Sequence, residues 1–333
     1  MRKIVAIAFA FVALMGCNDD NPKPAISILQ SDILIANQGN FGWGEGTLST
    51  YNPNTETVQN DVFKTINNQS LGNVFQSIAK INGLYYFVIN NSGKIIITDS
   101  TFSRIGEIDE LISPRYIYPV TETKAYITDL YADAISVVDL TINEVTKSIP
   151  VNGWSEKGVI KGSIFWFVAS ESNKIYGVDI LTDKVIDSIQ VAGFPESLVI
   201  DNSNQLWILC RGDENAQEKA ALMRIDETDE SIDLQIDIDN IPTNLVFDQS
   251  DDIIYFISDG VWSMKSSETV PNLIYDGQGK TFYSLDINPN NGELYVSDVV
   301  DFVSNSSILR FDKNGELIDQ FYAGIIAGDF FFQ

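Results

Sequence analysis

Residues 124–139 read KAYITDLYADAISVVD, two apolar segments around a short turn, and this pattern recurs along the chain. Residues 84–99 (LYYFVINNSGKIIITD) and 164–179 (IFWFVASESNKIYGVD) repeat it, one copy before this stretch and one copy after it. The aromatic of the first segment recurs with a period of about 40 residues, lengthened once before Tyr255, at Tyr86, Tyr126, Trp166, Trp207, Tyr255 and Tyr295. The second segment ends in aspartate at Asp99, Asp139, Asp179, Asp226 and Asp312. Two markers with one period indicate a repeat protein.

Each period contains four predicted strands. In the period that begins at Glu196 they are residues 197–200, 206–210, 221–225 and 232–238, separated by turn-forming residues. Four strands in about 40 residues are typical of a β-propeller blade, whereas a solenoid of βαβ units needs a helix in each repeat, and no useful apolar stripe of helical period is present. We interpret the repeated aromatics as core and the repeated aspartates as turn formers.

Seven copies of the second strand predict seven blades. The first copy, residues 32–36, has little chain before it, whereas residues 328–333 follow a complete last blade. We therefore predict an all-β fold, a seven-bladed β-propeller of four-stranded antiparallel blades, in which the C-terminal strand completes blade one. Such closure pairs the two free edges of the ring.

Composition excludes several classes of function. The 333 residues include 21 Lys and Arg against 46 Asp and Glu, a formal charge of −25, which argues against nucleic-acid binding. The absence of histidine removes His-based acid–base catalysis and imidazole metal ligands. Two cysteines allow neither a disulfide framework nor a multi-Cys zinc site. We expect no cofactor, and a buried, inert thiol at Cys210.

The N-terminus has the pattern of a signal peptide. Arg2 and Lys3 precede an apolar run, residues 4–14, that is too short to span a bilayer. The run ends in Leu14-Met15-Gly16-Cys17, which resembles a bacterial lipobox; ordinary secretion with an incidental cysteine is the alternative. We predict a lipoprotein signal peptide at residues 1–16, lipidation of Cys17, a flexible tether at 17–29, and a single propeller domain at 30–333.

The tether carries a second signal. The acidic pair Asp19-Asp20 resembles the export signal that sends Bacteroidetes lipoproteins to the outer face of the outer membrane; a generic polar spacer is the alternative. No later apolar run approaches the length of a membrane span, so lipid is the expected membrane attachment. We predict an outer-membrane protein that faces the cell exterior.

One face of the predicted ring is irregular. The loops between second and third strands lie on the same face as the crossings between blades, and three of them are long: residues 37–46, 211–219 and 299–307. Insertions on one face of a repeat ring usually mark its binding face. The candidate ligand-binding residues there are Asn37, Gln38, Asn40, Phe41, Trp43, Asn90, Asn91, Arg115, Asp129, Tyr131, Trp154, Phe194, Arg211, Tyr283 and Phe302.

Several stretches resemble a known family. They are residues 35–49 (IANQGNFGWGEGTLS), 90–94 (NNSGK), 128–131 (TDLY) and 294–298 (LYVSD), with Arg115-Tyr116 at the start of a blade. The chain resembles the YncE-like propeller lipoproteins of Bacteroidetes (DUF5074-type). One branch, the BtuG type, captures vitamin B12 and passes it to a TonB-dependent transporter. The resemblance implies a surface propeller whose ligand is a small nutrient such as a corrinoid. Without histidine, cobalt could not be held through imidazole, so recognition would use shape and peripheral hydrogen bonds.

The sequence leaves three functions open. The first is a non-enzymatic surface protein that captures a small ligand for a transporter. The second is a scaffold that uses the same face to bind a protein or a glycan. The third is a metal-dependent, lactonase-like hydrolase in which Asp129, Asp259 and Asp298 converge on the ring axis.

Overall fold

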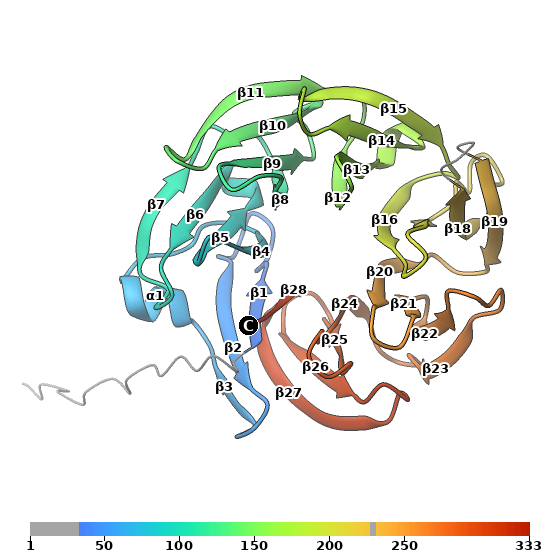
Figure 1. Cartoon of the computed structure of the whole chain (residues 1–333). Helices are drawn as coiled ribbons and strands as arrows, with labels where there is room; N and C mark the ends of the chain where they lie inside the picture. The colour runs from blue at the N-terminus through green and yellow to red at the C-terminus, as the bar shows by residue number, and fades with distance from the viewer. Residues whose placement is uncertain (1–32, 227–230) are drawn as a thin grey trace, which may run out of the picture.

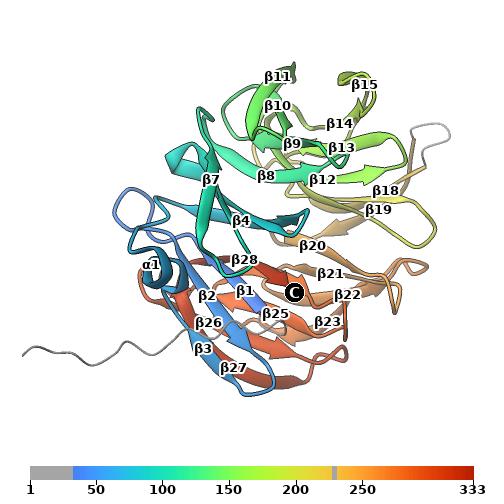
Figure 2. The ribbon, with the colours of Figure 1, turned by 60° about the vertical axis from the view of Figure 1, so that its left-hand side comes forward.

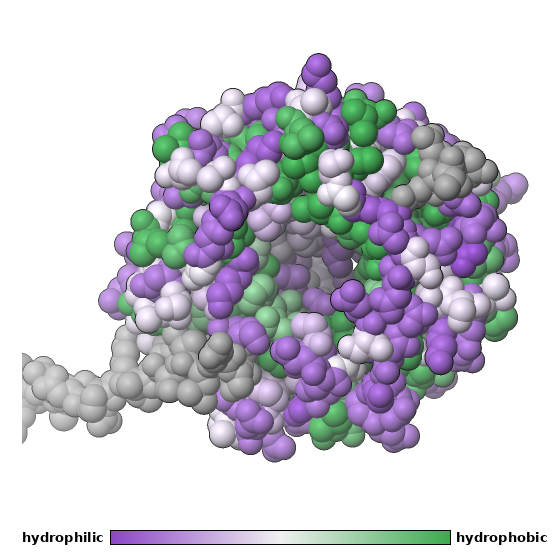
Figure 3. All heavy atoms as spheres, viewed as in Figure 1, coloured by the Kyte–Doolittle hydropathy of each residue, from purple (hydrophilic) through white to green (hydrophobic). Residues whose placement is uncertain are grey.

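Seven four-stranded antiparallel sheets surround a central axis in the computed structural model, which describes residues 33–226 and 231–333. Figure 1 shows the blades following one another around the ring, and Figure 3 shows that the ring is hollowed at its centre. The predicted fold class is therefore confirmed. The predicted signal peptide, the lipidation site Cys17 and the tether lie outside the described residues.

Each blade places its first strand nearest the axis. Blades one to three contain β28 (Ala327–Phe332), β1 (Ile33–Asn37), β2 (Thr47–Asn52) and β3 (Thr57–Gln59); β4 (Phe75–Ile81), β5 (Leu84–Ile89), β6 (Lys94–Thr98) and β7 (Arg104–Ile108); and β8 (Pro114–Pro119), β9 (Lys124–Asp129), β10 (Ala134–Asp139) and β11 (Glu144–Pro150).

Blades four to seven follow the same order. They contain β12 (Ser155–Lys161), β13 (Ile164–Ala169), β14 (Lys174–Asp179) and β15 (Lys184–Gln190); β16 (Pro195–Ile200), β17 (Leu206–Cys210), β18 (Ala220–Asp226) and β19 (Ser231–Ile238); β20 (Thr243–Asp248), β21 (Ile253–Ile257), β22 (Gly260–Lys265) and β23 (Asn272–Asp276); and β24 (Phe282–Ile287), β25 (Leu294–Asp298), β26 (Asn305–Phe311) and β27 (Leu317–Ile325).

The C-terminal strand closes the ring, as predicted. β28 pairs antiparallel with β1, so that Ile35 lies opposite Phe330 and Ile33 opposite Phe332. Strands from the two ends of the chain thus form one sheet, and the first and last blades have no free edge between them.

The hydrophobic core is divided among the contacts between blades. Seven clusters of buried side chains each join one pair of neighbouring blades. The repeated aromatics belong to these clusters: Tyr126, Trp207, Tyr255 and Tyr295 are fully buried. Cys210 is also completely buried in its cluster, and burial raises the pKa of its thiol to about 12. The predicted core role of these residues is confirmed.

Four of the five repeated aspartates cap turns, as predicted: Asp99, Asp139, Asp179 and Asp312. The turn after Asp226 lies outside the described residues. The carboxylate of Asp99 accepts hydrogen bonds from the backbone N–H groups of Thr101 and Ser103 at 2.8 and 3.0 Å, and Asp139 accepts from Thr141 at 2.8 Å. Hydrogen bonds from the hydroxyl and the backbone N–H of Thr141 lower the pKa of Asp139. These carboxylates stabilise turns at the end of the blades away from the loop face.

Helical structure is scarce. The α-helix α1 (Val62–Asn67) lies in the crossing between blades one and two, outside β2, where it buries Val62 and Phe63 (Figure 2). The sequence did not predict it, because six residues are too few for a helical period. Within residues 33–226 and 231–333, no helix has the length and apolar character needed to cross a membrane.

Candidate functional site

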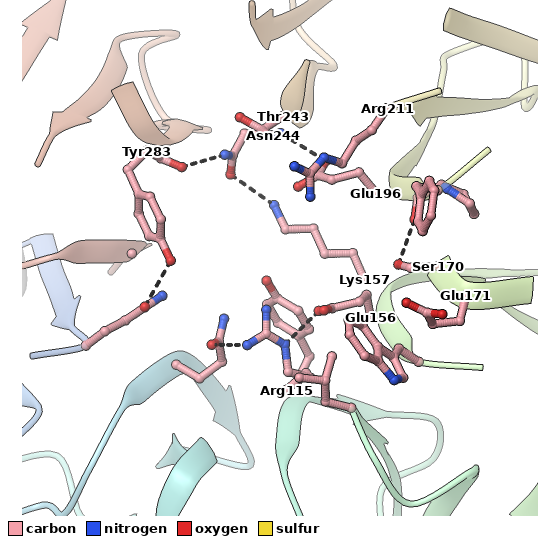
Figure 4. A pocket seen from close by; sticks show the side chains of 18 of the residues that line it. Arg115, Glu156, Lys157, Ser170, Glu171, Glu196, Arg211, Thr243, Asn244 and Tyr283 are labelled. Atoms are coloured by element: carbon pink, nitrogen blue, oxygen red, sulfur yellow. Dashed lines mark hydrogen bonds and ion pairs between the residues drawn. The ribbon is translucent and has the colours of Figure 1, made fainter. Parts of the chain in front are cut away.

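A cavity of about 470 Å³ lies on the ring axis and opens on the loop face. Its walls are the first residues of the innermost strands, together with residues from the loops and crossings above them. All seven blades contribute, and Figure 4 shows their side chains converging on the cavity. The volume falls within the range of small-molecule sites.

Every innermost strand contains an irregularity where it lines this cavity. In β4 the register passes from Phe75 to Ser77 while the partner strand advances by one residue, so that Gln76 is extra. The same shift occurs in the other six innermost strands. A β-bulge redirects a side chain and bends its strand. The residues at these shifts that line the cavity are Gln76, Arg115, Glu156, Lys157, Glu196, Asn244, Tyr283 and Gly328.

A half-buried ion pair joins blades three and four at the cavity wall. Arg115 Nε donates to Glu156 Oε2 over 2.7 Å, and its Nη1 donates to Gln76 Oε1 of blade two. Burial is the largest single influence on Arg115 and opposes its charge, but Glu156, Tyr116 and Tyr283 together outweigh burial and raise the pKa of the guanidinium. The guanidinium therefore stays charged and links three blades.

The opposite wall is rich in neutral polar groups. Asn244 Nδ2 donates to the Tyr283 carbonyl over 2.8 Å, and the Asn244 backbone N–H donates to Glu196 Oε2 over 3.0 Å. The Tyr283 hydroxyl donates to Gln38 Oε1 over 3.0 Å. Burial raises the pKa of Tyr283, which keeps its hydroxyl protonated. Gln38 also packs against Gly328, where a Cβ would lie only 2.4 Å from Gln38 Nε2, so a larger residue there would displace the Gln38 side chain.

Two carboxyl groups lie further along the innermost strands. Asp286 on β24 and Asp329 on β28 are surrounded by protein but keep some access to solvent. Burial raises the pKa of Asp286 to about 6, while Lys157 opposes the rise. Burial, then the Asp286 carboxylate, raise the pKa of Asp329 to about 8, against a 2.9 Å hydrogen bond from the Ile78 N–H and the charge of Lys157.

Asp329→Asn should make the protein less sensitive to alkaline pH. The folded state holds the Asp329 proton up to about pH 8, whereas the unfolded chain releases it near pH 3.8, so stability falls as pH rises through this window. Asparagine removes the cost, and we expect its stabilising effect to grow by roughly 2 kcal/mol from about pH 5.5 to about pH 9, with partial solvent access taken into account.

Urea denaturation across this pH range measures the difference. The control is Asp109→Asn, which changes an exposed carboxyl. A gain in the free energy of unfolding that is equal for both variants, or that decreases as pH rises, would contradict a raised pKa at Asp329.

Six of the fifteen predicted ligand-binding residues meet at the cavity: Gln38, Arg115, Trp154, Phe194, Arg211 and Tyr283. Tyr131 lies beside them, with its ring edge-on to Trp154 at 5.6 Å between centroids, and Phe302 packs in the same way on Tyr283 at 6.0 Å. These two aromatics extend the apolar surface around the mouth.

The structure places three predicted residues in the interior. Asn37 donates to the Ser49 hydroxyl over 2.8 Å, and Asn90 donates to the Ser113 hydroxyl over 2.9 Å. Asp129 accepts from the backbone N–H groups of Ser113 and Tyr131 at 2.8 and 2.9 Å. Their polar groups hold loops in place and do not line the cavity.

The remaining predicted residues lie on loops outside the cavity lining. The Asn40 carbonyl accepts a hydrogen bond from the Trp43 N–H within the β1–β2 loop. Asn91 Nδ2 donates to Asn73 Oδ1 over 2.6 Å beneath this loop. Phe41 and Trp43 project from this loop with 70% and 95% of their surface exposed. The structure thus separates an axial pocket from an exposed aromatic loop.

The aspartates of the hydrolase hypothesis have other partners. Asp298 accepts from the Thr281 and Val300 N–H groups at 2.9 and 3.1 Å, and Asp129 caps its own loop, while Asp259 lies in the β21–β22 turn. Across the described ranges, no group of three or more Asp, Glu or Cys side chains is arranged to hold a metal ion.

Sequence reasoning found Arg115 and Tyr283 on the innermost strands but missed the other polar residues there. Gln76, Tyr116, Glu156, Lys157, Glu196 and Asn244 all line the cavity. The available signal was the first strand of each period, where Arg115, Glu156 and Glu196 occupy near-equivalent positions in three consecutive copies. Sequence patterns predict that such a strand is buried in the core unless the position of its β-bulge is known.

The ring and its axial cavity define a seven-bladed β-propeller with a pocket suited to a small ligand. The chain belongs to the DUF5074 family, described as a domain of unknown function, which matches residues 31–325. No curated protein matches the chain in sequence.

Solved structures share the fold at low sequence identity. A quinonprotein alcohol dehydrogenase-like protein of Bacteroides thetaiotaomicron is 16% identical over 91% of this chain and 78% of its own, with a TM-score of 0.71. A candidate 6-phosphogluconolactonase of Bacteroides fragilis is 12% identical over 91% and 98%, with a TM-score of 0.68. Hydrazine synthase of Kuenenia stuttgartiensis is 16% identical over 76% and 88%, with a TM-score of 0.64. At these identities the similarity extends to the fold alone.

Proposed function

We propose that this protein is a non-enzymatic, surface-displayed lipoprotein that binds a small nutrient in its axial pocket and supplies it to a TonB-dependent transporter. The observation that carries the proposal is the pocket itself. Bulges in six innermost strands direct polar side chains into one cavity, and the aromatic side chains of Trp154, Phe194 and Tyr283 share its lining. Apolar surface with a few directed polar groups is how small-molecule sites are built.

The direction of the chain supports display at a surface. β1 runs from Ile33 to Asn37, and Gln38, the next residue, lines the pocket. The described chain therefore begins at the end of the blade opposite the pocket. With an anchor at Cys17, this direction favours a pocket that faces away from the membrane.

A corrinoid is the ligand that the family resemblance favours. Its peripheral amides suit partners such as Asn244, Gln38 and Gln76, and its flat faces suit Trp154 and Phe194. A corrinoid is broader than the cavity, so it would lie across the mouth, with part of the molecule entering between the blades.

Isothermal titration of the mature protein with cobalamin and cobinamide tests this ligand. We expect saturable binding of one molecule per chain, together with an increase in thermal stability. No heat and no thermal shift at high ligand concentration would exclude a corrinoid, and a wider set of nutrients would then be screened by thermal shift. Protease treatment of intact cells tests surface display, because an exposed propeller loses its loops and an inward-facing one does not.

The β1–β2 loop favours a second candidate function, the binding of a protein or glycan. Trp43 and Phe41 point into solvent from a loop whose backbone is held by Asn73: the Gly42 N–H donates to Asn73 Oδ1 over 3.2 Å, and Asn73 Nδ2 donates to the Gly44 carbonyl. Exposed aromatics on an ordered loop are frequent anchors of interfaces. Trp43→Ala should weaken capture of a transporter or polysaccharide and leave binding in the axial pocket intact. Equal loss of both activities would contradict this separation.

A further inference from the structure

Two of the three cations in the pocket lining form no ion pair with a carboxylate of residues 33–226 or 231–333. Arg115 pairs with Glu156 at 2.7 Å. In contrast, neither Lys157 nor Arg211 forms an ion pair with any residue in the described part of the chain. The one side-chain partner of the Lys157 ammonium among these residues is Asn244 Oδ1, at 3.5 Å. Figure 4 shows Lys157 extending across the cavity towards Asn244.

The acidic groups around these cations are already engaged or lie apart from them. Glu156 accepts from Arg115, and Glu196 accepts from the Asn244 N–H and the Ser197 hydroxyl. Glu171 lies at the rim on a short 3₁₀ helix, exposed to solvent. Asp286 and Asp329 face Lys157 from deeper along the axis, but neither forms an ion pair with its ammonium.

An ammonium in a partly enclosed cavity is stabilised by an anion. Transfer of a charge out of bulk water is costly unless a counter-charge and hydrogen bonds replace its hydration. This argument applies to the half-buried Lys157, whose three N–H donors have one side-chain acceptor among the described residues, Asn244 Oδ1. Arg211 is exposed at the mouth, where it adds a second cation with five N–H donors. The lining holds three cations and three carboxylates, but the side-chain donors of Lys157 and Arg211 are not paired with those carboxylates.

The two cations share a wall with apolar surface. Lys157 and Trp154 belong to blade four, and Arg211 and Phe194 belong to blade five. Asn244 and Gln38, from blades six and one, supply amide groups on the other wall. The pocket thus has an aromatic, cationic side and a neutral, hydrogen-bonding side.

We infer that the ligand carries an anionic group, a carboxylate or a phosphate, which Lys157 and Arg211 bind, while its flat apolar part lies against Trp154 and Phe194. This inference rests on the proposed binding function and adds the chemical class of the ligand. In a corrinoid, the phosphodiester of the nucleotide loop would be the anionic group. Cobalamin carries this phosphodiester and cobinamide lacks it.

Matched probes test the charge of the ligand. Benzoate and phenyl phosphate carry the two anionic groups, and benzamide is the neutral counterpart of benzoate. Titration of the mature protein by ligand-observed NMR should show binding of at least one anion and at least tenfold weaker binding of benzamide. Comparison of the two anions separates a carboxylate site from a phosphate site, and cobalamin should bind more tightly than cobinamide.

Variants connect the effect to the two cations. Lys157→Met and Arg211→Met should each weaken binding of the preferred anion by roughly 10- to 100-fold, because each removes a charge-assisted hydrogen bond. Lys157→Arg retains the charge and should retain most of the binding. The control, Lys184→Met, changes an exposed lysine on the outermost strand of blade four. Thermal denaturation checks that each variant is folded.

The outcomes separate the two proposals. If benzamide or cobinamide binds as tightly as its anionic counterpart, or if both methionine variants bind the anion as the wild type does, the anionic ligand is wrong and the small-molecule pocket stands. If the folded wild type binds neither a corrinoid nor any of the three aromatic probes, the proposed small-molecule function falls together with this inference.

Discussion

Deletion of residues 326–333 is expected to leave the chain without a stable ring. β28 is the innermost strand of blade one, and without it β1 exposes the backbone groups that now pair along Ile33–Asn37. The cluster between blades seven and one also loses Ala327 and Phe330. We expect the truncated protein to aggregate, with a much weaker β signal in circular dichroism and no cooperative unfolding transition.

A point variant measures the same closure within a full-length chain. Phe330 is buried against Tyr295, with ring centroids 6.0 Å apart. Phe330→Ala should lower the free energy of unfolding by about 3–5 kcal/mol, since it removes a buried aromatic and leaves a cavity. The matched control is Ile318→Ala on neighbouring β27, which changes an exposed apolar side chain and should alter stability by less than about 0.5 kcal/mol. Similar urea midpoints for the two variants would contradict closure by a tightly packed terminal strand.

Glu156→Ala is expected to have the second-largest effect. It leaves the Arg115 guanidinium beside the pocket without its carboxylate. Removal of one partner costs about 3–5 kcal/mol when an ion pair is fully buried, and this pair is half-buried. Part of the charge retains a partner, because Arg115 also donates to Gln76. We therefore expect urea denaturation to show that the free energy of unfolding falls by about 3 kcal/mol, near the lower end of that range.

A double variant and a control identify the cause. Arg115→Met combined with Glu156→Leu removes both charges and should be more stable than Glu156→Ala alone, because no buried charge is left unpaired. Glu107→Ala breaks the more exposed pair with Arg104, which has the same 2.7 Å separation, and should cost less than about 1 kcal/mol. If Glu156→Ala lowers the free energy of unfolding no more than Glu107→Ala does, the ion pair at the pocket is solvated like a surface ion pair.

The candidate site could be located from the sequence only in outline. Loop length correctly indicated which end of the blades holds the irregular segments, and Trp154, Phe194 and Arg211 were found because they lie in or beside those loops. Three other polar residues lie where a strand meets a loop on the same face, but each is buried and hydrogen-bonded within the protein: Asn37, Asn90 and Asp129. A polar residue at the start of a loop either faces a ligand or caps that loop, and the amino-acid sequence alone does not distinguish these two roles.

The sequence by itself determined the repeat, the number of blades and the closure by the C-terminal strand. Strand alternation, turn chemistry and the regular period are local properties that can be read along the chain. Only the tertiary structure decided what lies on the axis. Arg115 and Glu156 belong to different blades and meet because bulges in two separate strands turn both side chains towards the centre. The direction of a side chain at a β-bulge depends on how its strand pairs with the neighbouring strand. Which charged side chains come together on the axis depends on how seven strands that are distant in sequence pack around it.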